Sequence, residues 1–173
     1  LENCIKVVIK LGIKKIFINT FHLSEQIFDF VNSKNFPIDI QIIKDGDKIL
    51  DTGGGILNMI NHSKENDFLI FNPDTLWSNE YIDEIMMMQN FYLSNKLSNI
   101  LLVVRKELSF DKSFVGDFKL VNGLLKKDDN KDFIYIGCQI LNKGLFKNYE
   151  LKNFSVLEIW NKLIKKNELN GFR

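Results

Sequence analysis

Two short segments of this sequence combine residue types that could bind a phosphorylated ligand. The first is 51–55 (DTGGG), and the second is Asn72-Pro73-Asp74, at the end of the apolar run 67–72 (DFLIFN). Three successive glycines are costly to order and supply no side chains to a core, which favours a backbone lying flat against a ligand. A helix that follows them would direct free amide groups at an anion or a base edge. The alternative is a flexible tight turn in which Thr52 is an ordinary N-cap.

Asp74 has the position expected of a metal ligand. An acidic residue at the carboxyl end of a buried strand lies where open parallel sheets bind their ligands. Mg²⁺ prefers carboxylate and phosphate oxygens together, and Pro73 fixes a turn that would direct this carboxylate away from the sheet. The alternative is that Asp74 merely caps the loop before the next helix. The sequence alone leaves both interpretations open.

The other reactive side chains form no recognisable catalytic set. His22 and His62 are the only histidines, and Cys4 and Cys138 are the only cysteines. These residues offer neither zinc-ligand spacing nor a Ser-His-Asp or Cys-His arrangement. His22 follows a predicted strand and could face the cleft, although a lone histidine in such a loop more often packs the loop itself. Both cysteines lie in apolar segments, which favours buried thiols over a disulfide.

Hydrophobic periodicity predicts the elements that must position these segments. Helices are expected over 1–11, 23–31, 52–61 and 82–93, and strands over 15–19, 38–43, 67–72 and 100–104, the last two buried on both faces. This α-β-α-β-α-β-α-β order predicts an α/β fold with a Rossmann-like, mostly parallel sheet and helices on both faces. After residue 114 we expect a small antiparallel hairpin turning at Asn122-Gly123, a strand over 132–141, and a helix opened by the capping box 155–158 (SVLE).

Composition limits the classes of function. The 173 residues are enough for one domain, and a formal net charge of +1 with only two arginines gives no argument for nucleic acid or an anionic membrane. No apolar run approaches the ~20 residues that span a bilayer and no signal peptide is visible, so the expected location is the cytoplasm. The chain opens at Leu1 within a predicted helix and ends in a predicted loop, so we expect 1–173 to be one incomplete domain of a longer protein.

Taken together, these segments resemble the sugar-phosphate nucleotidyltransferase family, in particular its small uridylyltransferase members acting on N-acetylmuramate-1-phosphate and its mannose-1-phosphate guanylyltransferase-like members. The resemblance covers most of the chain, in the family's order: KLGIKKIFINTFHLSEQI (10–27), LDTGGGILN (50–58), FLIFNPDTLW (68–77), GDFKL (116–120) and IYIGCQILNKGLF (134–146).

The resemblance implies a nucleotide-diphospho-sugar transferase-like fold and an activity. Thr52, Gly53 and Gly54 would pack against the nucleoside, and Asp74 would be the catalytic ligand that holds Mg²⁺ against the α-phosphate. Asn72 and the segment around Gly137 would line the sugar side. The substrates would be an NTP and a sugar-1-phosphate, which would form an NDP-sugar and pyrophosphate, with catalysis by positioning and charge neutralisation.

The sequence also departs from the family pattern. The resemblance implies an initial strand with a glycine-rich loop that grips the triphosphate, which would precede Leu1, and a second metal-binding Asp that would lie beyond Arg173. Asn72-Pro73 replaces the small residue usual before the Asp. Two alternatives therefore stay open: an inactive or regulatory relative that binds a nucleotide, and an enzyme of the phosphocholine cytidylyltransferase type. The base, the sugar and the oligomeric state are not predicted.

Overall fold

The protein has the alternating helices and strands that the sequence predicts. A computed structural model describes every residue from Leu1 to Arg173. The alternating half comprises α1 (Glu2–Lys10), β1 (Lys15–Thr20), α2 (Ser24–Ser33), β2 (Asp39–Lys44), α3 (Asp51–Asn61), β3 (Asp67–Phe71), α4 (Tyr81–Ser94) and β4 (Asn99–Arg105). The rest comprises the 3-10 turn η1 (Lys106–Leu108), β5 (Lys119–Val121), β6 (Leu124–Lys126), β7 (Phe133–Asn142), η2 (Lys143–Phe146), α5 (Leu157–Lys166) and β8 (Gly171–Phe172).

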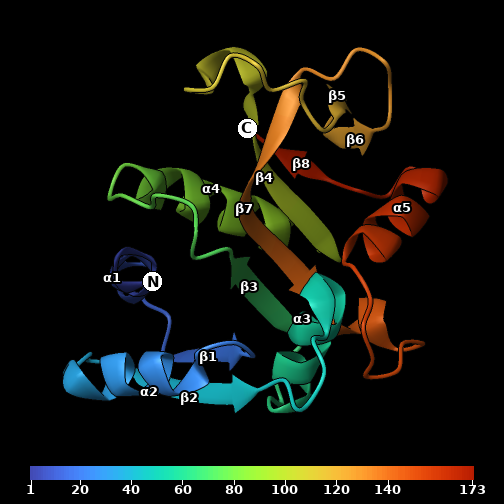
Figure 1. Cartoon of the computed structure of the whole chain (residues 1–173). Helices are drawn as coiled ribbons and strands as arrows, with labels where there is room; N and C mark the ends of the chain where they lie inside the picture. The colour runs from blue at the N-terminus through green and yellow to red at the C-terminus, as the bar shows by residue number, and fades with distance from the viewer.

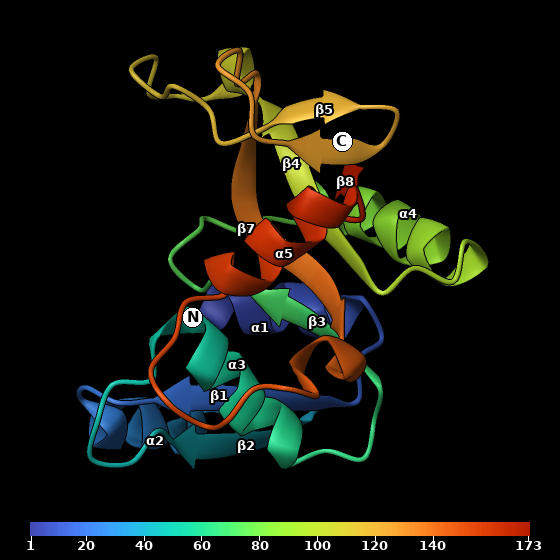
Figure 2. The ribbon, with the colours of Figure 1, turned by 90° about the vertical axis from the view of Figure 1, so that its right-hand side faces the viewer.

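The strands form a mostly parallel arrangement that confirms the predicted α/β class. β1 pairs with β2 in parallel, and a second sheet has the order β3-β7-β4-β8. β7 is antiparallel to both β3 and β4, so those two strands run in the same direction, and β4 pairs with β8 in parallel. Figure 2 shows the arrows of β1 and β3 pointing the same way. The predicted single sheet is therefore divided, because no strand joins β1 to β3.

Helices cover both faces of these strands, as predicted. Figure 1 shows α1 and α4 on one side of the four-stranded sheet and α3 and α5 on the other. Each side has its own buried apolar cluster, in which Ile85, Met88 and Ile100 are among the members on the α1/α4 side, and Leu57, Leu101 and Trp160 among those on the α3/α5 side. None of the helices has the length and apolar character needed to cross a membrane.

Local backbone geometry confirms the predicted hairpin and modifies two other predictions. Asn122 and Gly123 have φ of 51° and 78°, as a type I′ turn between β5 and β6 requires. The capping-box helix begins at Leu157, whose amide donates to the Ser155 hydroxyl at 3.3 Å. The tail predicted as a loop instead forms β8, because Leu169 is fully buried and the following residues pair with the edge of β4.

The two strands predicted to be buried on both faces differ in their exposure. In β4 the first five residues, Asn99–Val103, are buried, as the prediction requires. In β3 the four apolar residues Phe68–Phe71 are only partly buried, although their composition is similar. The physical reason is that β4 has a neighbouring strand on each side, β7 and β8, whereas β3 pairs with β7 alone.

Candidate functional site

The turn after β3 is tied to a glycine on the adjacent strand β7. The amide of Asn72 donates to the carbonyl of Gly137 at 2.7 Å, and the Thr75 hydroxyl donates to the carbonyl of Ile136 at 3.0 Å. The Trp77 indole N–H donates to the carbonyl of Asn72 at 2.9 Å. Gly137 has φ of +87°, and a Cβ there would lie 2.8 Å from the Thr75 hydroxyl and 2.9 Å from the Asn72 Cβ. This position therefore requires glycine for both conformation and space.

Asp74 lies in this turn with its carboxylate exposed to solvent. It makes no side-chain hydrogen bond and no ion pair, so its oxygens are available to a cation or to a ligand's donors. It follows Pro73 at the carboxyl end of β3, where the sequence places it. No group of three or more His, Cys, Asp or Glu side chains converges to hold a metal ion. Asp74 is thus a single protein ligand, not part of a preformed carboxylate cluster.

The glycine segment is part of α3 and does not precede it. The amides of Gly53 and Gly54 both donate to the carbonyl of Phe154, at 2.9 and 3.1 Å. The expectation that this helix start presents free amide groups is therefore wrong for these two amides, because another segment of the chain already binds them. A Cβ on Gly53 would overlap the Phe154 ring, and one on Gly54 would overlap the carbonyl of Lys152. Close packing of residues 152–154 thus accounts for these two glycines.

Thr52 joins the start of α3 to the start of α5. Its hydroxyl accepts a hydrogen bond from the amide of Val156 at 3.0 Å and lies 3.5 Å from the Ser155 hydroxyl. Thr52 is the second residue of α3 and not its N-cap, which is Leu50. The carbonyl of Leu50 accepts the amide of Phe154 at 3.1 Å, which closes a backbone link between the two segments. Nucleoside binding by Thr52, Gly53 and Gly54 remains a prediction.

Three polar side chains, of which only Asn58 is buried, fix α3 against the ends of β1 and β2. The Asp45 carboxylate accepts from the Asn19 amide at 2.9 Å and from the Asn58 amide at 3.0 Å. A Cβ on Gly55 would lie 2.7 Å from the Asn19 nitrogen, so the third glycine also permits a close contact. The sequence analysis missed Asp45, although an acidic residue directly after a strand was the same signal that singled out Asp74.

Comparison with known proteins identifies the fold. No family model matches the chain, and no curated protein matches its sequence. Among solved structures, HddC from Yersinia pseudotuberculosis aligns with 99% of this chain and 75% of its own, at a TM-score of 0.75 and 18% identity. The inositol-1-phosphate CTP transferase from T. maritima aligns with 99% and 71%, at 0.78 and 10% identity. UDP-glucose pyrophosphorylase complexed with UDP-glucose aligns with 99% and 77%, at 0.72 and 14% identity.

The chain has the same fold as these solved structures. The similarity extends over nearly the whole chain, while the low identities limit the inference to the fold. A further HddC structure from the same organism is complexed with GMP-PN, and it aligns with 96% of this chain at a TM-score of 0.73 and 19% identity.

Tyr135 of β7 packs against α5. Its ring packs edge-on against Trp160 of α5 with centroids 4.9 Å apart, and the Trp160 indole N–H donates to the Gln139 side chain at 3.0 Å. The Tyr135 hydroxyl is buried and has no hydrogen-bond partner. Burial raises the pKa of this phenol well above its ordinary value, and the Asp74 carboxylate raises it further. The phenol therefore stays protonated, with its buried hydroxyl near the Gln139 side chain.

The predicted site residues thus fall into two groups. Asn72, Asp74 and Gly137 come together at the carboxyl end of β3, whereas Thr52, Gly53 and Gly54 lie against the segment that leads into α5. His22 is exposed in the turn between β1 and α2. The sequence analysis missed Tyr135, because a tyrosine in an apolar strand is usually a core residue. The only signal in the sequence was its position two residues before Gly137.

Proposed function

We propose that this chain belongs to an enzyme that transfers a nucleoside monophosphate from an NTP to a sugar-1-phosphate. The observation that carries the proposal is the unpaired carboxylate of Asp74, at the carboxyl end of β3 in a fold that this chain shares with solved nucleotide-sugar enzymes. Ligands of open α/β sheets bind at this end of the strands. The complexes of HddC with GMP-PN and of UDP-glucose pyrophosphorylase with UDP-glucose are consistent with substrates of this kind.

The proposed reaction makes one bond and breaks one bond at phosphorus. An oxygen of the sugar-1-phosphate attacks the α-phosphorus of the NTP in line, the bond from that phosphorus to the bridging oxygen breaks, and pyrophosphate leaves. The protein supplies little covalent chemistry to such a transfer, so its contribution is positioning and charge neutralisation. The rigid turn formed by Asn72, Thr75 and Gly137 would hold the Asp74 carboxylate in a fixed position for this purpose.

The exposed Asp74 carboxylate at this turn fits a Mg²⁺ ion whose other ligands are water and substrate phosphates. Mg²⁺ in nucleotide enzymes is commonly held by one or two carboxylates, several waters and the phosphates of the substrate. One exposed and unpaired carboxylate meets that requirement, although the protein shows no preformed set of ligands. When bound, Mg²⁺ would neutralise charge on the phosphates, and Asp74 would hold it there. NTPs and sugar phosphates are cytoplasmic metabolites, which supports a cytoplasmic location in this proposal.

The test is release of pyrophosphate by the protein expressed from its complete reading frame. UTP, GTP and CTP are each combined with a panel of sugar-1-phosphates and with phosphocholine, in the presence of Mg²⁺. We expect one NTP and one sugar-1-phosphate to be turned over. Turnover only with CTP and phosphocholine would replace the acceptor, and no pyrophosphate from any pair would refute the enzymatic proposal.

Two variants make the test specific to the site. We expect Asp74→Asn to lower kcat/KM by about 100-fold or more, because it removes the charge while keeping the size of the side chain. Asp129→Asn is the matched control, since Asp129 is an exposed carboxylate at the hairpin and outside the site. Equal activity of the two variants would remove Asp74 from the mechanism. Calorimetric binding of Mg²⁺-NTP without turnover by the unmodified protein would support a regulatory relative instead.

A further inference from the structure

β2 forms the outer edge of its sheet and has a strand on one side only. It is hydrogen-bonded to β1 alone, and it runs along the lower margin of the molecule in both ribbon views (Figures 1 and 2). The amide of Asp45 donates to the carbonyl of Thr20 in β1 at 2.9 Å, and backbone groups alternate in direction along a strand. The N–H and C=O groups of Ile40 and Ile42 therefore point away from β1, and they are free to pair with a further strand.

This edge lacks most of the features that keep an edge strand unpaired. Charges occur only at the two ends of β2, on Asp39 and Lys44, and residues 40–43 (IQII) between them are uncharged. No bulge or proline interrupts the six paired residues of the strand. The edge at the far end of the four-stranded sheet is β8, which has only two residues. β2 is therefore the outer edge of this fold that is best suited to pairing.

An apolar groove of about 430 Å³ borders the same edge of β2. Phe28 and Val31 of α2 line one wall of this groove, and Ile40 and Ile42 of β2 line the other. Ile40 and Ile42 thus have side chains that face α2 and backbone groups that face outward. Phe28 is 49% exposed although it lies against the groove. The strand edge and the apolar side chains beside it therefore form one continuous surface.

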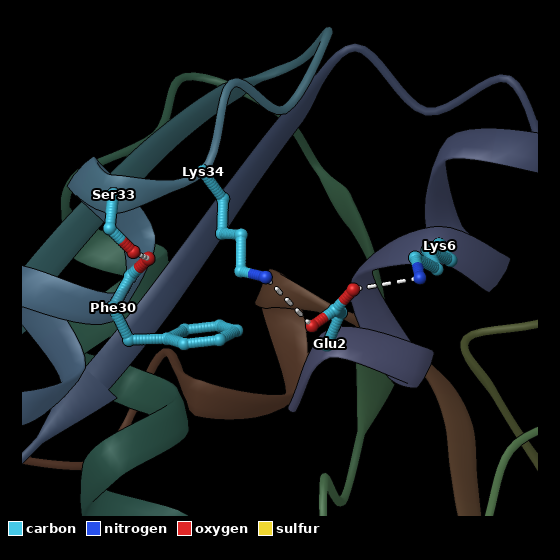
Figure 3. A network of polar contacts seen from close by, with 5 residues as sticks. All are labelled: Glu2, Lys6, Phe30, Ser33 and Lys34. Carbon is cyan, nitrogen blue, oxygen red and sulfur yellow. Dashed lines mark hydrogen bonds and ion pairs between the residues drawn. The ribbon is translucent and has the colours of Figure 1, made fainter.

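A neighbouring helix flanks α2 on one side only. Figure 3 shows Lys34, directly after α2, with its ammonium group 3.6 Å from the Glu2 carboxylate of α1, which also lies 2.7 Å from Lys6. These contacts place α1 beside α2. On the side toward the outer edge of β2, α2 has no helix next to it. The exposed part of Phe28 lies on this open side, beside the groove.

We propose that the outer edge of β2 and this groove bind a second copy of the chain, with the two β2 strands antiparallel about a two-fold axis. The direction of the backbone groups sets the register. Ile40 of each copy lies opposite Ile42 of the other and exchanges both backbone hydrogen bonds with it. Gln41 then lies on the axis, opposite its own counterpart, as an interface between identical surfaces requires. The strands β1 and β2 of both copies form one continuous sheet.

Three features of the surface favour a second copy over an unrelated strand. The Ile40 and Ile42 side chains of both copies come together on the α2 side, so the two grooves join. Phe28 of each copy borders that cluster, and its exposed ring becomes covered there. Antiparallel pairing also brings Asp39, at one end of β2, next to Lys44 of the other copy, whereas parallel pairing would bring like charges together.

Sedimentation equilibrium of the protein expressed from its complete reading frame tests the association. The six residues of β2 and ten of α2 make an interface of moderate size, so we expect a dissociation constant on the order of 10 µM. Phe28→Lys puts a charge into the joined grooves and is expected to raise this constant about 100-fold or more. Met87→Lys is the matched control, because Met87 of α4 is 48% exposed and lies outside this surface. A monomer at every concentration up to about 1 mM, or a dimer that Phe28→Lys leaves intact, would overturn the proposal.

A cysteine on the proposed axis tests the register without disturbing the groove. Opposite residues of a non-hydrogen-bonded antiparallel pair have Cα atoms about 4.5 Å apart, which a disulfide can bridge. Gln41→Cys should therefore form a covalent dimer when diamide takes up the two electrons and two protons of the thiols. Asp39→Cys is the control on the same strand, since its two copies would be more than about 12 Å apart and should stay unlinked. Cys4 and Cys138 are buried and common to both variants. No covalent dimer with Gln41→Cys, or equal linking of both variants, would also overturn the proposal.

Discussion

The packing of α3 against residues 152–154 leads to a quantitative prediction for Gly54→Ala. A Cβ on Gly54 would approach the Lys152 carbonyl oxygen closer than 3.0 Å and the Leu50 Cβ to 3.0 Å. The opposing segment cannot retreat freely, because the carbonyl of Phe154 accepts from Gly53 and Gly54 while its amide donates to Leu50. Alanine must therefore strain the contact or break these bonds.

The magnitude follows from three contributions. Overpacking costs about 2 kcal/mol, and weakening two backbone hydrogen bonds costs about 1 kcal/mol each. Alanine in place of glycine within a helix raises the free energy of unfolding by about 0.5–1 kcal/mol. The net expected loss in the free energy of unfolding is about 3 kcal/mol. With a urea m-value of about 2 kcal/mol/M, the unfolding midpoint should fall by about 1.5 M.

Urea unfolding monitored by the fluorescence of Trp77 and Trp160 measures this shift. Gly12→Ala is the control, because Gly12 has φ of +76° and no atom within 4 Å of its added Cβ, so only backbone strain of about 1 kcal/mol applies. A Gly54→Ala protein as stable as the unmodified one, or less affected than Gly12→Ala, would refute the packing explanation. Preserved stability with lost NTP binding would assign the glycine to the ligand instead.

Three further substitutions probe buried groups. Burial raises the pKa of the Cys4 thiol from 9.0 to about 11, so the stability that the protonated thiol contributes is complete below pH 9 and is lost as the pH rises towards 11. Cys4→Ala should therefore remove about 2 kcal/mol of the loss in the free energy of unfolding that the unmodified protein shows at alkaline pH. An identical alkaline loss in both proteins would contradict this. The Tyr92 hydroxyl donates to the Asp67 carboxylate at 2.5 Å. Tyr92→Phe should therefore lower the free energy of unfolding by about 2 kcal/mol and Tm by about 4–8 °C. A fall in Tm below about 1 °C would show that this hydrogen bond contributes little. Gln139→Leu leaves the buried Trp160 N–H without an acceptor and should lower the free energy of unfolding in urea by about 2 kcal/mol. The same substitution should cost less in a Trp160→Phe protein, where that donor is already absent. If the costs of the two substitutions simply add in the double variant, the hydrogen bond contributes no stability.

The positions of the elements could be predicted because their signals are local. The helical stripe of α3 and the alternation of β2 depend only on residues a few positions apart, and the Asn122-Gly123 turn needs only two residues that accept positive φ. The position of Asp74 at a strand end follows from the same local pattern. For this reason the predicted and observed elements agree to within a few residues through most of the chain.

Contacts between segments far apart in the sequence could not be predicted. Apolar composition places β3 in a sheet, but whether it has one neighbour or two depends on the pairing of β1, which no local pattern encodes. The direction of β7 is likewise a property of the whole sheet. β8 escaped prediction because its two residues pair with β4 some 70 positions earlier and carry no periodicity of their own.

The sequence by itself determined the alternating α/β order, the type I′ hairpin and the position of Asp74 in the turn after an apolar strand. Only the tertiary structure decided what the three glycines of α3 touch. Their cost in chain entropy is visible in the sequence, but a ligand and a packed segment explain it equally well. Long-range folding brings Phe154 and Lys152 within contact of Gly53 and Gly54, about a hundred residues away, and the carbonyl of Phe154 takes both amides.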